Sequence, residues 1–125
     1  MNSAQWSVLV GAVYGFVGVA LGAFGAHALR GRLSAELLAV WKTAVEYQLY
    51  HALALVLVGL IAVQRPSIAI SNSSICFALG VLIFSGSLYL LALTGVRWLG
   101  AVTPIGGILL LAGWALLLWA ALKQF

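Results

Sequence analysis

The residues that could do chemistry gather around one short stretch of the chain. It holds a carboxylate, Glu46, and an imidazole, His51, five positions apart, and a second imidazole, His27, precedes them. A carboxylate and an imidazole near neutral pH can exchange a proton or hold a cationic group. The candidate polar or ligand site therefore consists of His27, Lys42, Glu46, Tyr47, Tyr50 and His51.

Three interpretations of this site stay open at the level of sequence. Polar side chains inside a membrane bundle can satisfy one another, which would make the site a structural network that locks two helices together. The same groups could bind a small ligand or lipid headgroup, or relay protons through Glu46 and His51. A metal centre of His27, Glu46 and His51 matches no familiar ligand spacing, so neither a metal nor a cofactor is expected.

Catalysis has less support than binding. The chain has no aspartate, and Glu36 and Glu46 are its only carboxylates, so paired-carboxylate chemistry is not expected within one subunit. Ser85 and Ser87 have no base beside them in the sequence, and Cys76 is the only cysteine. We therefore assign no catalytic residue and expect an enzyme less than a binding protein.

The elements that must position these residues are membrane helices. Hydrophobic residues make up 65% of the 125 residues and charged residues 6%, and the mean hydropathy is +1.18. This composition lies far outside the range of soluble domains. The six basic residues stand singly, so the net charge of +4 indicates membrane flanks and no nucleic-acid partner.

Four apolar stretches are long enough to cross about 30 Å of hydrocarbon. We predict an all-α membrane protein with a single domain over residues 1–125, built as a bundle of four transmembrane helices with short connections. Ser34 is an expected N-cap that would extend the second helix to about 34–64. Thr103 and Pro104 either begin the fourth helix or kink it. The expected spans are 6–28, 43–63, 75–94 and 101–122.

The basic residues predict the orientation. If all four helices cross, one side of the membrane receives four of the six and the other side two. Lys and Arg accumulate on the cytoplasmic side, so both termini are predicted to lie outside. The two sets are Arg30, Arg32, Lys42 and Arg97, against Arg65 and Lys123.

Small residues predict where helices pack. Five glycines of the first helix recur with a 3.5-residue period, which forms a stripe that lets another helix approach closely. Gly106 and Gly113 repeat at seven on the fourth helix and are the expected partner of that stripe. A subunit interface or a channel lining are the other interpretations. The glycine stripe consists of Gly11, Gly15, Gly18, Gly22 and Gly25.

Four motifs occur in the order found in one known family. They are Gly22-Ala-Phe-Gly-Ala-His27, Tyr47-Gln-Leu-Tyr-His51-Ala, Phe84-Ser-Gly-Ser-Leu-Tyr89 and Thr103-Pro-Ile-Gly-Gly107, the last followed by Ala112-Gly-Trp114. From about residue 11 to residue 120 the chain resembles the small bacterial inner-membrane proteins of the YgdD type, the domain-of-unknown-function family 423. The resemblance implies a four-span protein of the bacterial inner membrane and brings no established activity, substrate or catalytic residue.

The expected function is that of a small polytopic membrane protein that binds lipid or another protein. Its expected partners are the bilayer itself, a bound lipid or small molecule, and a second copy of the chain or another membrane protein. The alternative is a small proton-coupled transporter or channel that uses Glu46 and His51. Small multidrug exporters share that architecture, although here Glu46 lies near the start of the second helix.

Overall fold

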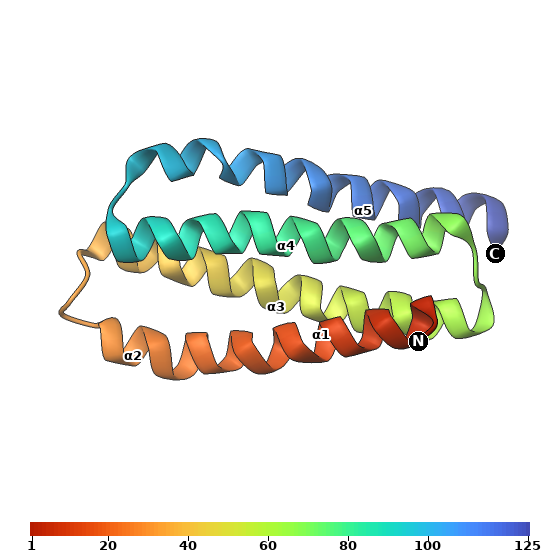
Figure 1. Cartoon of the computed structure of the whole chain (residues 1–125), viewed down its shortest axis with the longest axis horizontal. Coiled ribbons are helices and arrows are strands. Elements are labelled where there is room, and N and C mark those ends of the chain that lie inside the picture. The colour runs from red at the N-terminus through yellow and green to blue at the C-terminus, as the bar shows by residue number, and fades with distance from the viewer.

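The chain folds into four long antiparallel helical segments joined by short connections. The computed structural model describes residues 1–125 in full (Figure 1). The segments long and apolar enough to cross a membrane are Ser3–Leu29, Ala35–Gln64, Ile68–Thr94 and Arg97–Gln124. This confirms the predicted all-α fold class. The elements are α1 (Ser3–Ala20), a π-helical turn η1 (Leu21–Gly25), α2 (Ala26–Leu29), α3 (Ala35–Gln64), α4 (Ile68–Thr94), a 3-10 turn η2 (Arg97–Ala101) and α5 (Thr103–Gln124).

Hydroxyl side chains define where α3 and α4 begin. The Ser34 hydroxyl accepts a hydrogen bond from the Leu37 amide at 3.2 Å, the expected N-cap of α3. Ser67 caps α4 in the same way, so α4 begins seven residues before the predicted span. The polar start of α4 is helical because Ser73 and Ser74 are buried and hydrogen-bonded inside the bundle.

Pro104 lies in the first turn of α5 and does not kink the helix. The N-cap residue is Val102, which has no side chain able to accept a hydrogen bond. Thr103, the first residue of α5, hydrogen-bonds with the Ser87 hydroxyl at 2.6 Å. A first-turn proline is tolerated because its missing amide would have no partner within the helix.

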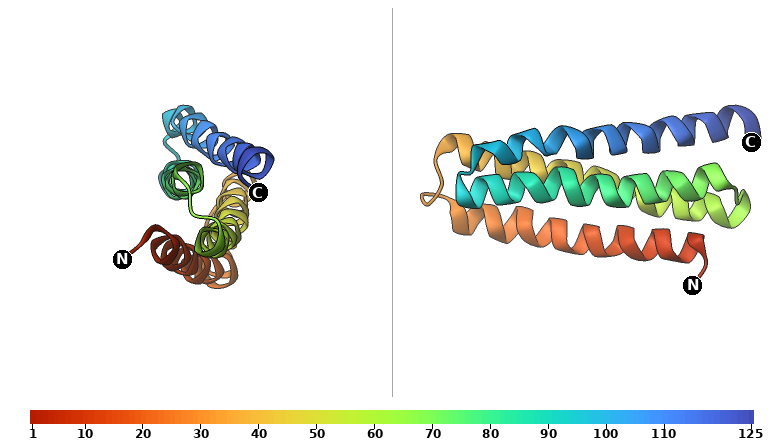
Figure 2. Two further views of the ribbon diagram at one scale, coloured as in Figure 1. Left: turned by 90° about the vertical axis from the view of Figure 1, so that its right-hand side faces the viewer. Right: turned by 45° about the horizontal axis from the view of Figure 1, so that its top comes forward.

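The helices pack in a chain of neighbours and do not form a closed square. α1 packs along α3, α3 along α4, and α4 along α5, so α5 lies at one edge of the bundle (Figure 2). The core between these pairs contains Leu55, Val58, Ile70 and Phe77, all fully buried. Because α5 has only one extensive neighbour, much of its surface stays open.

The glycine stripe of the first helical segment lies against α3. A Cβ added at Gly11 would be 2.8 Å from the carbonyl oxygen of Ala52, and one at Gly18 would be 2.7 Å from Cδ2 of Leu49. At Gly11 the neighbouring atoms belong to the α3 backbone, so the two helices approach there as closely as glycine permits, whereas at Gly18 the space is taken by the Leu49 side chain. Gly22 and Gly25 face Val45 and Trp41 in the same way, and Gly15 lies 3.9 Å from the Ala52 side chain.

The expected pairing between this stripe and the fourth helix is wrong. Gly106 packs against the backbone of Phe84, and Gly113 against the Phe77 ring, so both glycines face α4. The short connection from Gly95 to Val102 makes α4 and α5 antiparallel neighbours. α1 is placed on the far side of α3, out of reach of α5 (Figure 2).

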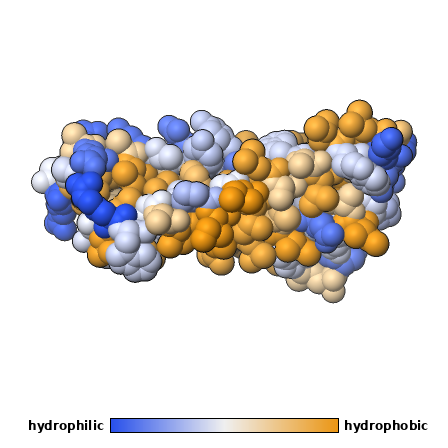
Figure 3. Space-filling model, turned by 90° about the horizontal axis from the view of Figure 1, so that it is seen from above, coloured by the Kyte–Doolittle hydropathy of each residue, from blue (hydrophilic) through white to orange (hydrophobic).

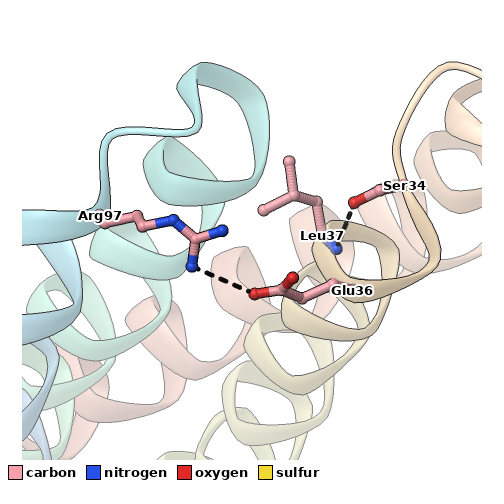
Figure 4. Close-up of polar contacts among 4 residues, drawn as sticks. All are labelled: Ser34, Glu36, Leu37 and Arg97. Atoms are coloured by element: carbon pink, nitrogen blue, oxygen red, sulfur yellow. Dashed lines mark hydrogen bonds and ion pairs between the residues drawn. The ribbon is translucent and has the colours of Figure 1, made fainter.

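Charged residues mark the two ends of the bundle, and its middle is largely apolar (Figure 3). At one end the exposed pair Glu36 and Arg97 joins the first and third connections at 3.4 Å (Figure 4). At the other end, where both termini lie, Arg65 donates to the backbone carbonyl of Gln124 at 3.2 Å (Figure 1). The polar ends match the headgroup regions of a bilayer, and the apolar middle matches its hydrocarbon core.

Candidate functional site

The structure divides the predicted polar cluster: Tyr47 and His51 line one cavity, whereas Lys42 and Glu46 line a groove beside Gly22 and Ala26. His51 is buried, but Glu46, Lys42 and His27 are exposed, and the only ion pair in the chain is the one between Glu36 and Arg97. Residues five positions apart on a helix point about 140° away from each other. Glu46 and His51 therefore cannot both face the interior, so the candidate residues do not form the structural network that was one interpretation of the sequence. No three histidine, cysteine or carboxylate side chains meet at one point.

His51 joins α3 to α5 through one ring nitrogen, and its other ring nitrogen bonds within α3. Its Nδ1 lies 2.7 Å from the carbonyl oxygen of Tyr47, and its Nε2 lies 3.0 Å from the indole nitrogen of Trp114. A carbonyl only accepts and an indole N–H only donates, so Nδ1 carries the proton and Nε2 accepts. His51 is therefore held as one neutral tautomer, and both nitrogens are engaged.

Aromatic rings interlock around His51. Phe77 lies 5.4 Å from the His51 ring and 5.0 Å from the Trp114 ring, both in tilted or edge-on geometry. Tyr47 packs against Phe84 with ring centroids 4.5 Å apart. Such arrangements match the quadrupoles of aromatic rings and hold them in defined positions. The cluster thus forms a rigid wall contributed by α3, α4 and α5.

This wall borders a cavity of about 470 Å³ between α3 and α5, with α4 as its floor. The cavity exists because α5 packs on α4 and not along α3, and because Gly107 puts no side chain into the space. Its mouth carries the exposed side chains Ile108 and Leu111, 66% and 70% accessible. The main lining residues are Tyr47, His51, Phe84, Pro104, Gly107 and Trp114.

A second polar connection ties α1, α3 and α4 together through Gln48. Its side-chain amide donates to the carbonyl of Tyr14 at 2.9 Å, and its oxygen accepts from the Tyr89 hydroxyl at 2.6 Å. The Tyr14 hydroxyl in turn donates to the carbonyl of Ala78 at 2.7 Å. Every polar group here has a partner inside the bundle, so this cluster serves packing in the manner expected of membrane helices.

The π-helical turn explains one of the sequence motifs. The carbonyl of Leu21 accepts from the Ala26 amide, one residue further than in an α-helix, and also from the indole of Trp41 at 3.0 Å. Gly25 leaves room for that indole, because an added Cβ would lie 2.8 Å from it. The widened turn therefore serves as a docking point for Trp41.

The candidate site predicted from the sequence lacks Tyr89 and Trp114, although both lie within the quoted motifs. Their roles depend on partners from other helices. Trp114 and His51 are 63 positions apart in the chain. Two of the candidate residues, Tyr47 and His51, line the α3–α5 cavity, and Tyr50 is exposed on the surface of α3.

The chain is a small polytopic integral membrane protein. It has four long apolar helices, an apolar middle, and interior polar groups that hydrogen-bond with one another. Residues 21–107 match the model of a family described as a protein of unknown function, DUF423. The chain belongs to this family, which is also named UPF0382 in its curated members.

Relatives match over nearly their whole length. A UPF0382 membrane protein of Staphylococcus haemolyticus is 47% identical over 116 residues, which cover 93% of this chain and 94% of the relative. The inner membrane protein YgdD of Escherichia coli is 43% identical over 121 residues, 97% of this chain and 92% of that protein. YwdK of Bacillus subtilis is 39% identical over 117 residues, 93% and 95% of the two chains. No solved structure matches the chain.

Proposed function

We propose that the protein is a lipid-binding helical bundle whose α3–α5 cavity holds an acyl chain of a membrane lipid. The observation that carries the proposal is the cavity of about 470 Å³ with a wall of interlocked aromatic rings. Apolar pockets with few polar groups are the usual form of small-molecule sites. An acyl chain fits because the mouth of the cavity opens sideways between Ile108 and Leu111, towards the hydrocarbon.

The depth of the cavity supports an apolar occupant. His51 lies 16 residues after Ala35, which places it about 24 Å along α3, near the middle of a helix about 45 Å long. A polar headgroup would be far from water at that level. The cavity extends from Trp114 to Pro104, and Pro104 lies at the end of the bundle that carries Arg97. A lipid can therefore place its chain along the rings and its headgroup beside that basic end.

Filling the cavity should remove the lipid. Gly107→Leu places an isobutyl group in the space, and its Cβ meets only Phe84 ring atoms at 3.8 Å or more, so the fold should survive. We expect lipid occupancy to fall roughly tenfold, the effect of losing about 1.4 kcal/mol of binding. Native mass spectrometry of gently extracted protein measures the retained phospholipid.

Gly86→Leu is the matched control. Gly86 also has open space around it, but it lines a smaller groove between α1 and α4. It should retain lipid at the level of the unmodified protein. Lipid loss in Gly86→Leu together with retention in Gly107→Leu would move the site to the other groove and refute the proposal.

The alternative of a proton-coupled transporter or channel has weaker support from the geometry. Such a protein would use Glu46 and His51 together, and these residues lie on different faces of α3. Both nitrogens of His51 already have partners within the bundle. Lipid binding needs neither group to titrate.

For orientation, we propose that the protein lies in a bacterial inner membrane with both termini outside. The ion pair between Glu36 and Arg97 supports a common side for the first and third connections, which also carry Arg30 and Arg32. The excess of Lys and Arg on that side favours the cytoplasm. A phosphatase that is active only outside the cytoplasm should work when fused after Phe125. Activity of a cytoplasm-only reporter at the same position would reverse the orientation.

A further inference from the structure

An exposed stripe runs along α3, and only its Glu46 end borders a shallow groove shared with Gly22 and Ala26. Its residues follow steps of four, three, four, three and four, which is the 3.5-residue period of a helix that packs against another helix. The middle of the stripe is leucine-rich, and Leu53, Leu57 and Leu60 are 67%, 60% and 55% exposed. The complete stripe is Glu46, Tyr50, Leu53, Leu57, Leu60 and Gln64.

No helix of the same chain covers this stripe. α1 packs on the face of α3 that carries Trp41, Val45 and Ala52. α4 packs on the face that carries Ala44 and His51, where Ala44 accepts from Ser85 and the His51 ring meets Phe77. The stripe lies between these two faces on the outer side of the helix and is separate from the cavity that faces α5.

Glu46 places a carboxylate on the stripe at a depth where lipid tails offer no hydrogen-bond partner or counter-charge. It lies 11 residues after Ala35, about 16 Å along α3. If the hydrocarbon is about 30 Å thick and centred on this helix, Glu46 sits about 9 Å inside it. An ionised carboxylate is strongly disfavoured there and normally has a partner. Within the chain Glu46 has no ion pair, and neither has the exposed Lys42 one turn away.

We propose that two copies of the chain associate in parallel through the α3 stripe, with Lys42 of each copy paired with Glu46 of the other. A two-fold axis along the membrane normal brings the same depths of both helices together, so the contact is self-complementary. In this arrangement Lys42 of one copy and Glu46 of the other differ in depth by one helical turn, about 6 Å. A lysine side chain can span that distance. Two unpaired charges per subunit thereby become two ion pairs, and the leucines between them pack as in a coiled coil.

Disulfide trapping in native membranes tests this contact. Leu57→Cys is introduced into full-length protein carrying Cys76→Ser, and a mild oxidant is added. Leu57 would lie beside its own copy across the axis, so a covalent dimer should form in high yield. Leu118→Cys on α5 is the matched control, because Leu118 is 62% exposed and Leu57 is 60% exposed. Equal yields at the two positions would mean that the stripe faces lipid, and the dimer would be excluded.

Charge exchange tests the pairing. Glu46→Lys should lower the cross-linking yield of the Leu57→Cys protein about tenfold, because it sets lysines against lysines in the seam. Lys42→Glu should do the same, and the double exchange should restore the yield. All three variants should retain lipid in the α3–α5 cavity, which shows that the subunit is folded. An unchanged yield in Glu46→Lys would refute the pairing, since a pair within one helix would not affect association.

Discussion

Alanine at Gly106 or Gly11 is expected to destabilise the bundle severely, although it adds a single methyl group. At Gly106 that methyl group would collide with the backbone nitrogen of Phe84 and lie 2.8 Å from its Cα. At Gly11 it would lie 2.8 Å from the backbone oxygen of Ala52. Backbone atoms cannot turn aside as a side chain can, so the helices themselves must separate. We expect each variant to lose about 2 kcal/mol of unfolding free energy.

The same substitution at two neighbouring glycines provides the control. A methyl group at Gly15 would lie 3.9 Å from the Ala52 side chain, and one at Gly107 would lie 3.8 Å from the Phe84 ring. Both are ordinary contacts. Alanine also favours the helix over glycine by up to about 1 kcal/mol, so these two variants should be neutral or more stable. Unfolding in mixed micelles, followed by far-ultraviolet circular dichroism, compares all four. Equal stability would show that the helices are not in close contact at Gly106 and Gly11.

Loss of the hydrogen bond between His51 and Trp114 is the second large effect expected. His51→Leu leaves the indole N–H of Trp114 without its acceptor near the middle of the bundle. Hydrocarbon offers the indole N–H no other acceptor, and a polar group left unpaired away from water costs about 1–3 kcal/mol, so we expect a loss of about 2 kcal/mol. Trp114→Phe should cost a similar amount, because it leaves Nε2 of His51 without a donor.

The double variant distinguishes this bond from simple packing. In the double variant both partners are apolar, so no polar group is left unpaired. Its loss of unfolding free energy should therefore be about 1–2 kcal/mol smaller than the sum of the two single losses. Unfolding free energies in mixed micelles supply the four values of the cycle. Additive losses would mean that the two rings contribute only as independent packing groups. Retained lipid should decrease in both single variants, because this bond holds the wall of the cavity.

Several local features were readable directly from residue types. Ser34 was predicted as an N-cap and accepts the Leu37 amide, because a hydroxyl before a helix satisfies a donor that the helix leaves free. The residue types around Pro104 allow either a helix start or a kink, and Pro104 takes the first-turn position, which costs no hydrogen bond. The start of α4 was placed too late, because Ser73 and Ser74 look like a connection until the carbonyl and hydroxyl that they bond are seen.

The direction of each side chain depended on which helix lay beside it. The sequence located polar residues at one level of α3, and the expectation that Glu46 and His51 act together came from their closeness along the chain. On the helix they diverge, and His51 instead meets Trp114, a residue that no spacing rule connects to it. The glycines of α5 were likewise matched to the wrong partner, since a small residue indicates a close neighbour without identifying it.

Composition and segment length are enough to place this protein in a membrane as four helices. An uninterrupted apolar segment of about 20 residues has the length of a membrane-spanning helix, which satisfies its own backbone hydrogen bonds, and it is recognised from composition and length alone. The packing of the helices, in contrast, places α5 at the edge, opens the α3–α5 cavity beside it and turns Glu46 outward. These features depend on which of the four helices pack against one another, and all four have similar hydropathy. The packing is set by close contacts at glycines and by interior hydrogen bonds between residues far apart in the chain.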